Sequence, residues 1–314
     1  MEITNVSKDG TQQTYDQLFC SAKALTDIRE HLITPSVLNI LLSITAILGN
    51  TLIQIALHKE SSLHPPTKLL LRSLSASDLC VGLTAGPVFA TTFSSSLKED
   101  WDICRFAVKT GFIANFFLCP LSLLTLSPIS VDRLLALLLG LRCRQLVTLR
   151  WTWVEVVTIW TLSSLPSTIY LWNEQVTLTC GAILTSLCLL ISVFSNTKIF
   201  LNLRRHWSQV QDHGLQQASL AGQLNIVRYR KAVNSALWLQ LTLVVCYLPA
   251  GIVQVVLMTK EFSSSLYLAG HIAATLVCLN STLNPILYCW KIKEVRQAVK
   301  DTIRALCCLS TQLQ

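Results

Sequence analysis

The sequence is poor in charged residues. Asp, Glu, Lys and Arg make up 13% of its 314 residues, whereas soluble domains carry about 25%. Hydrophobic residues reach 52%, and the mean hydropathy is +0.51. This shortage of charge excludes an ordinary soluble domain and indicates a membrane protein.

Several functional motifs are missing as well. Residues 1–34 hold no apolar core of the kind found in a cleaved signal peptide, so we expect the first membrane span to direct insertion. The twelve cysteines include no CxxC pair with the spacing of metal ligands, which argues against a zinc site. No nucleophile and base form a credible catalytic set. We therefore predict that the protein is not an enzyme and needs no organic cofactor.

Long apolar stretches dominate what is present. A helix needs about 20 apolar residues to cross a bilayer, and seven stretches meet this requirement. They lie at about 36–57, 68–93, 107–139, 152–172, 176–203, 232–258 and 266–290. We therefore predict an all-α membrane protein with an N-terminal segment over 1–35, a seven-transmembrane helix bundle over 36–290 and a tail over 291–314.

The basic residues are distributed unevenly between the ends of these spans. With the amino terminus outside, 18 of the 25 Lys and Arg residues fall on the cytoplasmic side and 7 on the outer side, as the positive-inside rule requires. We therefore expect a multi-pass plasma-membrane protein with an extracellular N-terminus and a cytoplasmic C-terminus. The net charge of +8 then indicates contact with the lipid bilayer and a cytoplasmic partner, and no nucleic acid.

Both ends of the chain carry candidate modification sites. The sequon at Asn5 lies on the outer side and predicts N-glycosylation. After the last span, apolar residues recur at three- and four-residue steps, at Ile292, Val295, Val299 and Ile303. This spacing predicts a short amphipathic helix in the membrane interface, where Cys307 and Cys308 are candidate palmitoylation sites. The alternative is a solvated tail with incidental cysteines.

A carboxylate lies in the middle of the second span. Ionisable groups inside the membrane are costly and usually functional, and Asp78 has apolar neighbours on both sides. Neutral polar residues alone would be explained by hydrogen bonds between helices, but the carboxylate favours a functional cluster. The polar residues expected at its depth are Asn50, Ser122, Asn280, Ser281 and Asn284.

Two prolines interrupt the last two spans. Pro249 and Pro285 each lack a backbone donor and are expected to kink their helices. Neighbouring side chains and water can satisfy the carbonyls that are freed. A kinked, polar-lined interior is suited to a bundle that adopts two packings.

Taken in order, these motifs resemble those of the rhodopsin-like (class A) G-protein-coupled receptors. The matching residues are Gly49-Asn50, Leu74 with Asp78, Ser130-Val131-Asp132-Arg133, Trp160, Cys246-Tyr247-Leu248-Pro249 and Asn284-Pro285-Ile286-Leu287-Tyr288. The resemblance covers about residues 36–305. It implies a receptor that transmits an extracellular signal to a heterotrimeric G protein.

The resemblance also implies roles for individual residues. Asp78, Asn50, Ser122, Asn280, Ser281 and Asn284 would form a pocket for a sodium ion and water in the resting state. Pro249, Pro285 and Tyr247 would act as hinges. Arg133 would be held by Asp132 at rest and then contact the G protein, together with Tyr288, Arg228 and Lys231.

The chain departs from the family pattern at several positions. Tyr247 stands where the sixth-span motif usually has Trp, and Asn196 where the fifth span usually has Tyr. Pro120 and Pro128 lie in the third span, which is ordinarily unbroken. No acid lies near Tyr229 to hold Arg133, which predicts raised basal signalling. Because of these departures, one alternative is a seven-helix protein of this family that no longer couples to a G protein.

Cys104 resembles the outer cysteine at the start of the third span, but the sequence does not decide which cysteine forms a disulfide with it. It lies 28 residues before Asp132, about one helical turn more than usual, and the loop that normally supplies the partner is almost absent. Cys20 and Cys180 are both on the oxidising outer side. A free thiol is the third alternative.

The ligand is constrained by what the expected pocket lacks. Asn115 stands where amine receptors have an acid, and Cys278 where opsins have a lysine, so neither ligand class is expected. Candidate pocket residues are Phe112, Asn115, Phe116, Cys119, Tyr247 and His271, although aromatic residues at such spacing often only pack. The short outer loops resemble those of the melanocortin, adenosine and cannabinoid group, and the acidic outer surface would favour a basic peptide, while the extracellular ligand stays open as a peptide or a small molecule. A transporter that uses Asp78 as a proton or ion site is the remaining alternative, against which the lack of an internal repeat argues.

Overall fold

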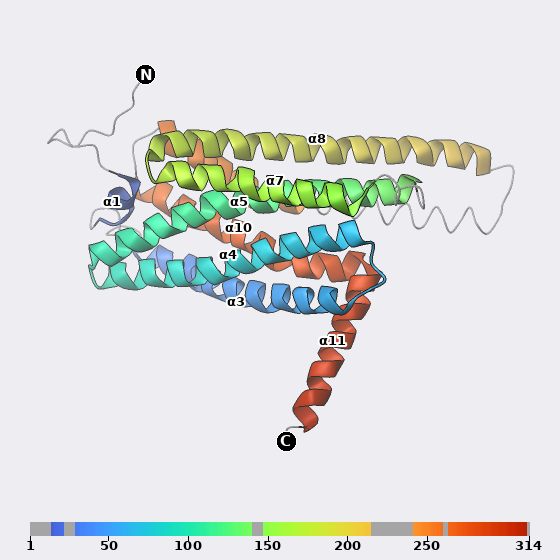
Figure 1. Ribbon diagram of the computed structural model, residues 1–314. Coiled ribbons are helices and arrows are strands. Elements are labelled where there is room, and N and C mark those ends of the chain that lie inside the picture. Colours follow the sequence, from blue (N-terminus) through green and yellow to red (C-terminus); the bar gives the residue numbers. More distant parts are fainter. Residues whose placement is uncertain (1–13, 22–28, 140–146, 215–240, 260–262, 313–314) are drawn as a thin grey trace.

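The computed structural model describes residues 14–21, 29–139, 147–214, 241–259 and 263–312, and these ranges are almost entirely helical (Figure 1). Long apolar runs account for this, because a backbone in lipid must satisfy its own hydrogen bonds. The elements are α1 (Tyr15–Phe19), α3 (Arg29–Lys59), α4 (Pro65–Leu97), α5 (Trp101–Leu139), α7 (Leu149–Tyr170), α8 (Glu174–Gly214), the helical segment Leu241–Thr259, α10 (Ser264–Lys291) and α11 (Lys293–Gln312).

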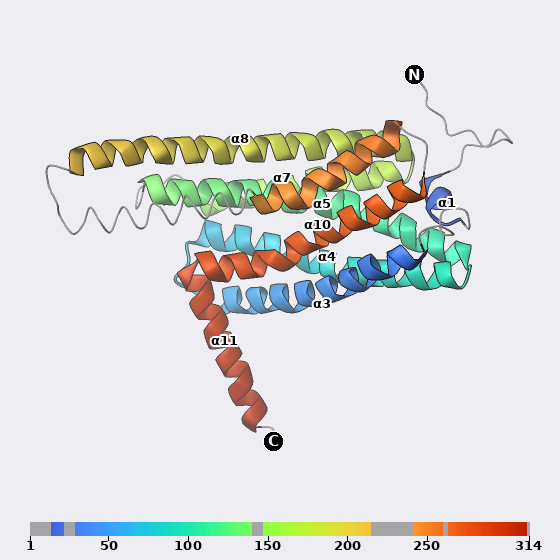
Figure 2. The same ribbon diagram turned by 180° about the vertical axis from the view of Figure 1, so that it is seen from behind.

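The long helices lie side by side in one bundle, and α11 leaves it at a steep angle (Figures 1 and 2). Helix α4 packs between α3 and α5, and α10 packs on α3. The short α1 sits at the opposite end of the bundle from α11, against α5. Two ends are therefore distinct: one carries the N-terminal segment and the other the C-terminal helix.

Six described helices are long and apolar enough to cross a membrane, and they match six of the predicted spans. They are Glu30–Lys59, Pro65–Leu97, Trp101–Ile129, Glu174–Phe194, Leu241–Thr259 and Ser264–Trp290. The predicted span at 152–172 is α7, which is helical but less apolar, because it is rich in Trp, Thr and Ser.

Helix α7 nevertheless has the hydrogen bonding of a membrane span. The Thr158, Thr161 and Ser164 hydroxyls donate to carbonyls of their own helix at 2.8, 2.6 and 2.7 Å. A hydroxyl bonded in this way leaves no unpaired donor in lipid. Apolar side chains such as Val157 and Leu165 point outward and are more than half exposed. Helix α7 is thus the seventh spanning helix of the bundle, although its composition alone does not indicate a span.

The first two spans approach each other closely. A Cβ atom added at Gly82 would lie 2.9 Å from Ile47 Cγ1 and 3.0 Å from the Ser43 carbonyl oxygen. Small residues allow this contact between membrane helices, where packing replaces the hydrophobic effect as the driving force. The pairing of α3 and α4 fixes the depth of Asn50 relative to Asp78.

Helix α5 is continuous through Pro120 and Pro128. The structure therefore shows no break in the third span, and the helix continues to Leu139. Ile292, which follows α10, and Val295 and Val299 of α11 are buried, whereas Ile303 is 44% exposed. Three of the four residues of the predicted apolar face are thus covered by protein, and the last is not, because α11 runs away from the bundle (Figure 1).

Candidate functional site

The Asp78 carboxylate lies at the meeting point of α4, α5 and α10. Its exposed fraction is 0%. Asn284 donates from Nδ2 to Asp78 Oδ2 at 2.7 Å, and the Ser122 hydroxyl donates to Oδ1 at 3.4 Å. The Ser281 hydroxyl lies beside the same carboxyl group. The predicted polar residues of three different spans therefore gather around one buried acid.

Asn50 belongs to this cluster through the backbone of α10. Pro285 has no N–H, so the carbonyl of Ser281, four residues earlier, loses its helical partner. Asn50 donates from Nδ2 to that carbonyl oxygen at 3.1 Å. Gly49 permits the approach, because an added Cβ would lie 3.1 Å from Pro285 Cγ. Asn50 thus gives the Ser281 carbonyl the partner that Pro285 cannot provide, and it does not bond to Asp78 directly.

Asn280 connects the cluster to the sixth span. Its Nδ2 atom donates to the Tyr247 hydroxyl at 3.3 Å, and the Ser122 hydroxyl lies close to the same group. Tyr247 is 1% exposed. The predicted hinge residue Tyr247 is therefore held by the polar cluster.

The inner end of the predicted site is described only in part. Tyr288 is 4% exposed, and its hydroxyl has no hydrogen-bond partner among the described residues. Asp132 and Arg133 lie in the last turns of α5, but their side chains fall outside the described residues. So do Arg228, Lys231 and Asn5.

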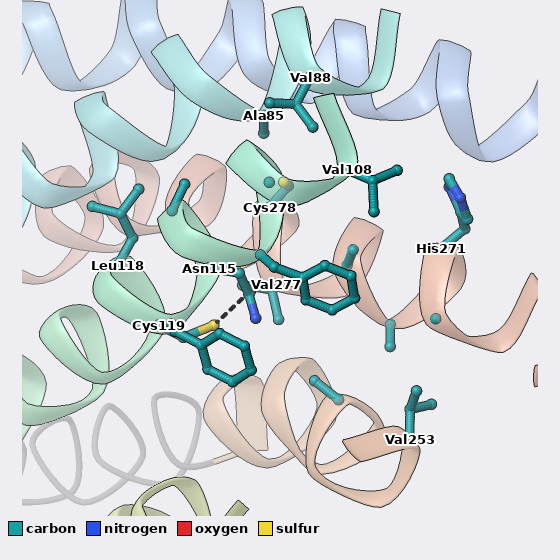
Figure 3. A pocket seen from close by; sticks show the side chains of 18 of the residues that line it. Ala85, Val88, Val108, Asn115, Leu118, Cys119, Val253, His271, Val277 and Cys278 are labelled. Atoms are coloured by element: carbon teal, nitrogen blue, oxygen red, sulfur yellow. Dashed lines mark hydrogen bonds between the residues drawn. The ribbon is translucent and has the colours of Figure 1, made fainter. Parts of the chain in front are cut away.

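A cavity of about 210 Å³ lies on the side of the polar cluster that faces α1, whose Phe19 lines it (Figure 3). The Cys119 thiol donates to Asn115 Oδ1 at 3.3 Å in its wall. Tyr247 also lines it, so one side chain touches both the cavity and the polar cluster. The structure brings all of the predicted pocket residues to this wall: Phe112, Asn115, Phe116, Cys119, Tyr247 and His271.

The sequence did not predict that the N-terminal segment reaches this cavity. Cys20 forms a disulfide with Cys104, and Cys180 is free, which decides between the alternatives for Cys104. The neighbouring residue Phe19 lines the cavity. The centroid of its ring lies 5.5 Å from that of Phe112 and 4.9 Å from that of Tyr267. The adjacency of an aromatic residue to a candidate outer cysteine was the available signal.

Aromatic residues pack against one another in the wall of the cavity. The rings of Phe112 and Phe116 stack with their centroids 6.2 Å apart. Gly181 leaves room for the Phe116 ring, because an added Cβ at this position would lie 2.7 Å from it. His271 contacts the edges of Phe89 and Tyr267 at 5.4 and 4.7 Å. Thr92 and Gln254, which the sequence did not indicate, also line the cavity.

The cluster around Asp78 has the donors that a sodium ion prefers. Hard cations take oxygen ligands, and the Asp78 carboxylate lies beside the Ser122 and Ser281 hydroxyls. Asn50 Oδ1 is buried and has no hydrogen-bond partner in the described part of the chain. Among the same residues no three His, Cys, Asp or Glu side chains gather to hold a metal ion. The donor set therefore fits a monovalent hard cation.

Spanning helices around a cavity, with a buried carboxylate beneath it, are the arrangement expected of a membrane receptor. Comparison with known proteins gives the family. The profile of the 7 transmembrane receptor (rhodopsin family) matches residues 49–177 and 164–288. The chain therefore belongs to the rhodopsin family of seven-transmembrane receptors and is a multi-pass membrane protein.

The relatives are signalling receptors. The chain is 25% identical to adenosine receptor A2b of Gallus gallus, over 87% of this chain and 88% of the relative, and 27% identical to human adenosine receptor A2a, over 84% and 70%. It is 22% identical to melanocortin receptor 5 of Mus musculus, over 85% and 82%. The protein is thus a G-protein-coupled receptor and not an enzyme, and the family favours this reading over a transporter or a non-coupling relative.

Proposed function

We propose that this receptor lies in the plasma membrane with its N-terminus outside, and that an extracellular ligand in the cavity drives coupling to a heterotrimeric G protein. The observation that carries the proposal is the position of Tyr247. Its side chain lines the cavity, and its hydroxyl accepts a hydrogen bond from Asn280 in the polar cluster. A ligand that displaces this ring must also disturb the cluster.

The contacts that connect Tyr247 to the far end of α10 are few. Asn280 and Asn284 are one turn apart on α10, and Asn284 is bonded to Asp78. Pro285 follows directly, and the buried Tyr288 lies one turn further toward the inner end. A ligand with different affinity for two packings of α10 shifts the equilibrium between them. We infer that the Tyr288 ring changes its position in this transition.

The cluster around Asp78 would hold a sodium ion through Asp78, Ser122, Ser281 and Asn50. When bound there, the ion supplies the counter-charge to the buried carboxylate, since no described Lys or Arg forms an ion pair with it. These residues are drawn from α3, α4, α5 and α10. Their contacts hold the four helices in one packing, which we assign to the resting state.

The inner end would contact the G protein through Arg133, released from Asp132, with Arg228, Lys231 and Tyr288 around it. The sequence offers no acid near Tyr229 to hold Arg133. Basal coupling is therefore expected without added ligand.

The test is G-protein dissociation in cells that express equal surface amounts of each variant. We expect wild-type basal output above that of untransfected cells, its loss in Arg133→Ala, and altered output in Asp78→Asn. Arg150→Ala is the matched control, because Arg150 is an exposed basic residue at the start of α7. Basal output equal to that of untransfected cells, or no change in either variant, would contradict the proposal.

A further inference from the structure

The cavity has no partner for a charged ligand. It is lined by 27 described residues, and none of them is Asp, Glu, Lys or Arg. Most are Val, Ala, Leu or Phe. A charge buried without a counter-charge is strongly unfavourable. The wall therefore selects against cationic amines, carboxylates and basic peptides, whatever the charge of the outer surface.

Three polar atoms in the wall are without partners. Thr92 Oγ1, Gln254 Oε1 and His271 Nδ1 are all buried, and none makes a hydrogen bond within the described residues. Native proteins satisfy most buried polar atoms. The three atoms come from α4, from Leu241–Thr259 and from α10, and all three residues line this one cavity. Their shared position points to a ligand that bonds with them.

These polar groups belong to one end of the cavity. Figure 3 shows His271 and Val253 at one end and Leu118 and Cys119 at the other. Gln254 lies about two helical turns beyond Tyr247 along its helix, away from the polar cluster, and Thr92 lies about one turn beyond Phe89, whose ring contacts His271. Other polar groups of the wall already have partners: Asn115 and Cys119 bond to each other, the Thr84 hydroxyl bonds to its own helix, and the Tyr247 hydroxyl accepts from Asn280. A ligand that fits would have a polar group at one end and an apolar body.

Phe19 limits the size of what can bind. Its side chain is 8% exposed and is wedged between Phe112 and Tyr267 at the wall of the cavity. The disulfide from Cys20 to Cys104 fixes the segment that carries it. A peptide that enters from outside would have to displace this covalently tethered ring, whereas a small apolar molecule fits beneath it.

We propose that the cavity binds an uncharged, largely apolar small molecule whose hydrogen-bonding group is held by Thr92, Gln254 and His271, beneath the tethered ring of Phe19. This inference rests on the proposed function, since it names the ligand class of the receptor. It also goes against the basic peptide that the acidic outer surface would favour.

The experiment uses direct binding to the purified full-length receptor in lipid nanodiscs. The probe is a ten-carbon alcohol that carries a photoactivatable diazirine. The charged comparison probe has the same carbon chain and diazirine but ends in a trimethylammonium group. An arginine-rich hexapeptide is added as a competitor for the labelling. Labelled residues are identified by mass spectrometry. We expect the alcohol to label cavity residues such as Val253 and Ala274 in excess over lipid-facing residues such as Ile272, and we expect the ammonium probe not to.

Variants connect this labelling to the polar atoms. The triple substitution Thr92→Val, Gln254→Leu, His271→Phe should lower cavity labelling by about tenfold, the effect of losing one or two hydrogen bonds. Thr45→Val is the matched control, because the exposed Thr45 hydroxyl bonds to its own helix at 2.9 Å. Thermal unfolding of each variant shows whether it is folded. If the triple variant does not fold, Phe19→Ala provides the second test and should speed cavity labelling by the alcohol.

Each result decides the inference. Cavity labelling by the ammonium probe, competition by the peptide, or equal labelling of wild type and triple variant would overturn it. None of these readouts involves a G protein. Loss of basal output in Arg133→Ala together with a failed alcohol probe would therefore remove the ligand class and leave the proposed function intact.

Discussion

Tyr247 joins the ligand cavity to the polar cluster, because it lines the cavity and its hydroxyl accepts a hydrogen bond from Asn280. Tyr247→Phe removes this hydroxyl and keeps the ring that lines the cavity. A buried hydrogen bond contributes about 1 kcal/mol, so we expect basal G-protein dissociation to change about fivefold while binding of the uncharged probe is preserved. Thr158→Val, which removes a hydroxyl bonded within α7 at 2.8 Å, should change neither. Equal losses of binding and signalling would show that Tyr247 only shapes the cavity.

The Asp78 carboxylate supplies the charge of the proposed sodium site. We expect sodium chloride, compared with N-methylglucamine chloride at equal ionic strength, to raise the unfolding temperature of the purified receptor. Asp78→Asn should abolish this difference, because an amide cannot balance the charge of the ion. Asp102→Asn removes an acid that is 95% exposed and should leave the sodium effect unchanged. A sodium effect that survives in Asp78→Asn would place the ion elsewhere.

At the scale of elements, the close contact of α3 with α4 limits residue 82 to glycine. In Gly82→Ala the new Cβ would meet backbone atoms of α3, including the Ser43 oxygen at 3.0 Å. Overpacking of this kind costs about 1–3 kcal/mol, so a lower unfolding temperature is expected. Gly251→Ala is the control, because its nearest neighbour would be 3.9 Å away. Similar unfolding temperatures for both variants would show that α3 and α4 can separate at no cost.

The covalent link between α1 and α5 makes a second prediction about elements. Cys20→Ser, Cys104→Ser and the double variant should lower the unfolding temperature equally, because each removes the same disulfide. Cys180→Ser, which removes a free exposed thiol, should have no effect. Additive losses in the double variant would mean that the two cysteines act separately.

The elements differ in how far the sequence predicted them. Six spans were clear, because uninterrupted apolar runs have one structural solution in lipid. Helix α7 was placed in the right range although its Thr and Ser content lowers its apolar character. The long extension of α8 to Gly214 and the early start of α3 at Arg29 were not predicted. Hydropathy stops at the membrane boundary, whereas a helix continues until its capping or packing changes.

Some contacts of the site could be predicted from the sequence and others could not. The grouping of Asn50, Ser122 and Asn284 near Asp78 followed from the need of buried polar atoms for partners at equal depth. The assignment of Asn50 to the Ser281 carbonyl and of Asn280 to Tyr247 did not follow, because several partners were within reach. The position of Phe19 could not be predicted, since the pairing of Cys20 was open and nothing local fixes a segment outside the membrane.

For the whole molecule, every functional statement depends on which end of the bundle faces outward. The structure places α1 and its disulfide at one end and α11 at the other. Disulfides form on the oxidising outer side, which favours α1 outside, and the distribution of basic residues favours α11 in the cytoplasm. Both arguments give the same orientation from independent chemistry.

The sequon at Asn5 allows this orientation to be measured. If the N-terminus is outside, the chain expressed in animal cells carries a glycan at Asn5, because glycosylation occurs only on the luminal side of the secretory pathway. Treatment with an N-glycosidase should increase the mobility of the wild type on a denaturing gel and leave Asn5→Gln unchanged. An epitope tag placed before Tyr15 should be stained on intact cells, whereas one after Gln312 should need permeabilised cells. Staining of the C-terminal tag on intact cells would reverse the topology and place the cavity beneath Phe19 on the cytoplasmic side.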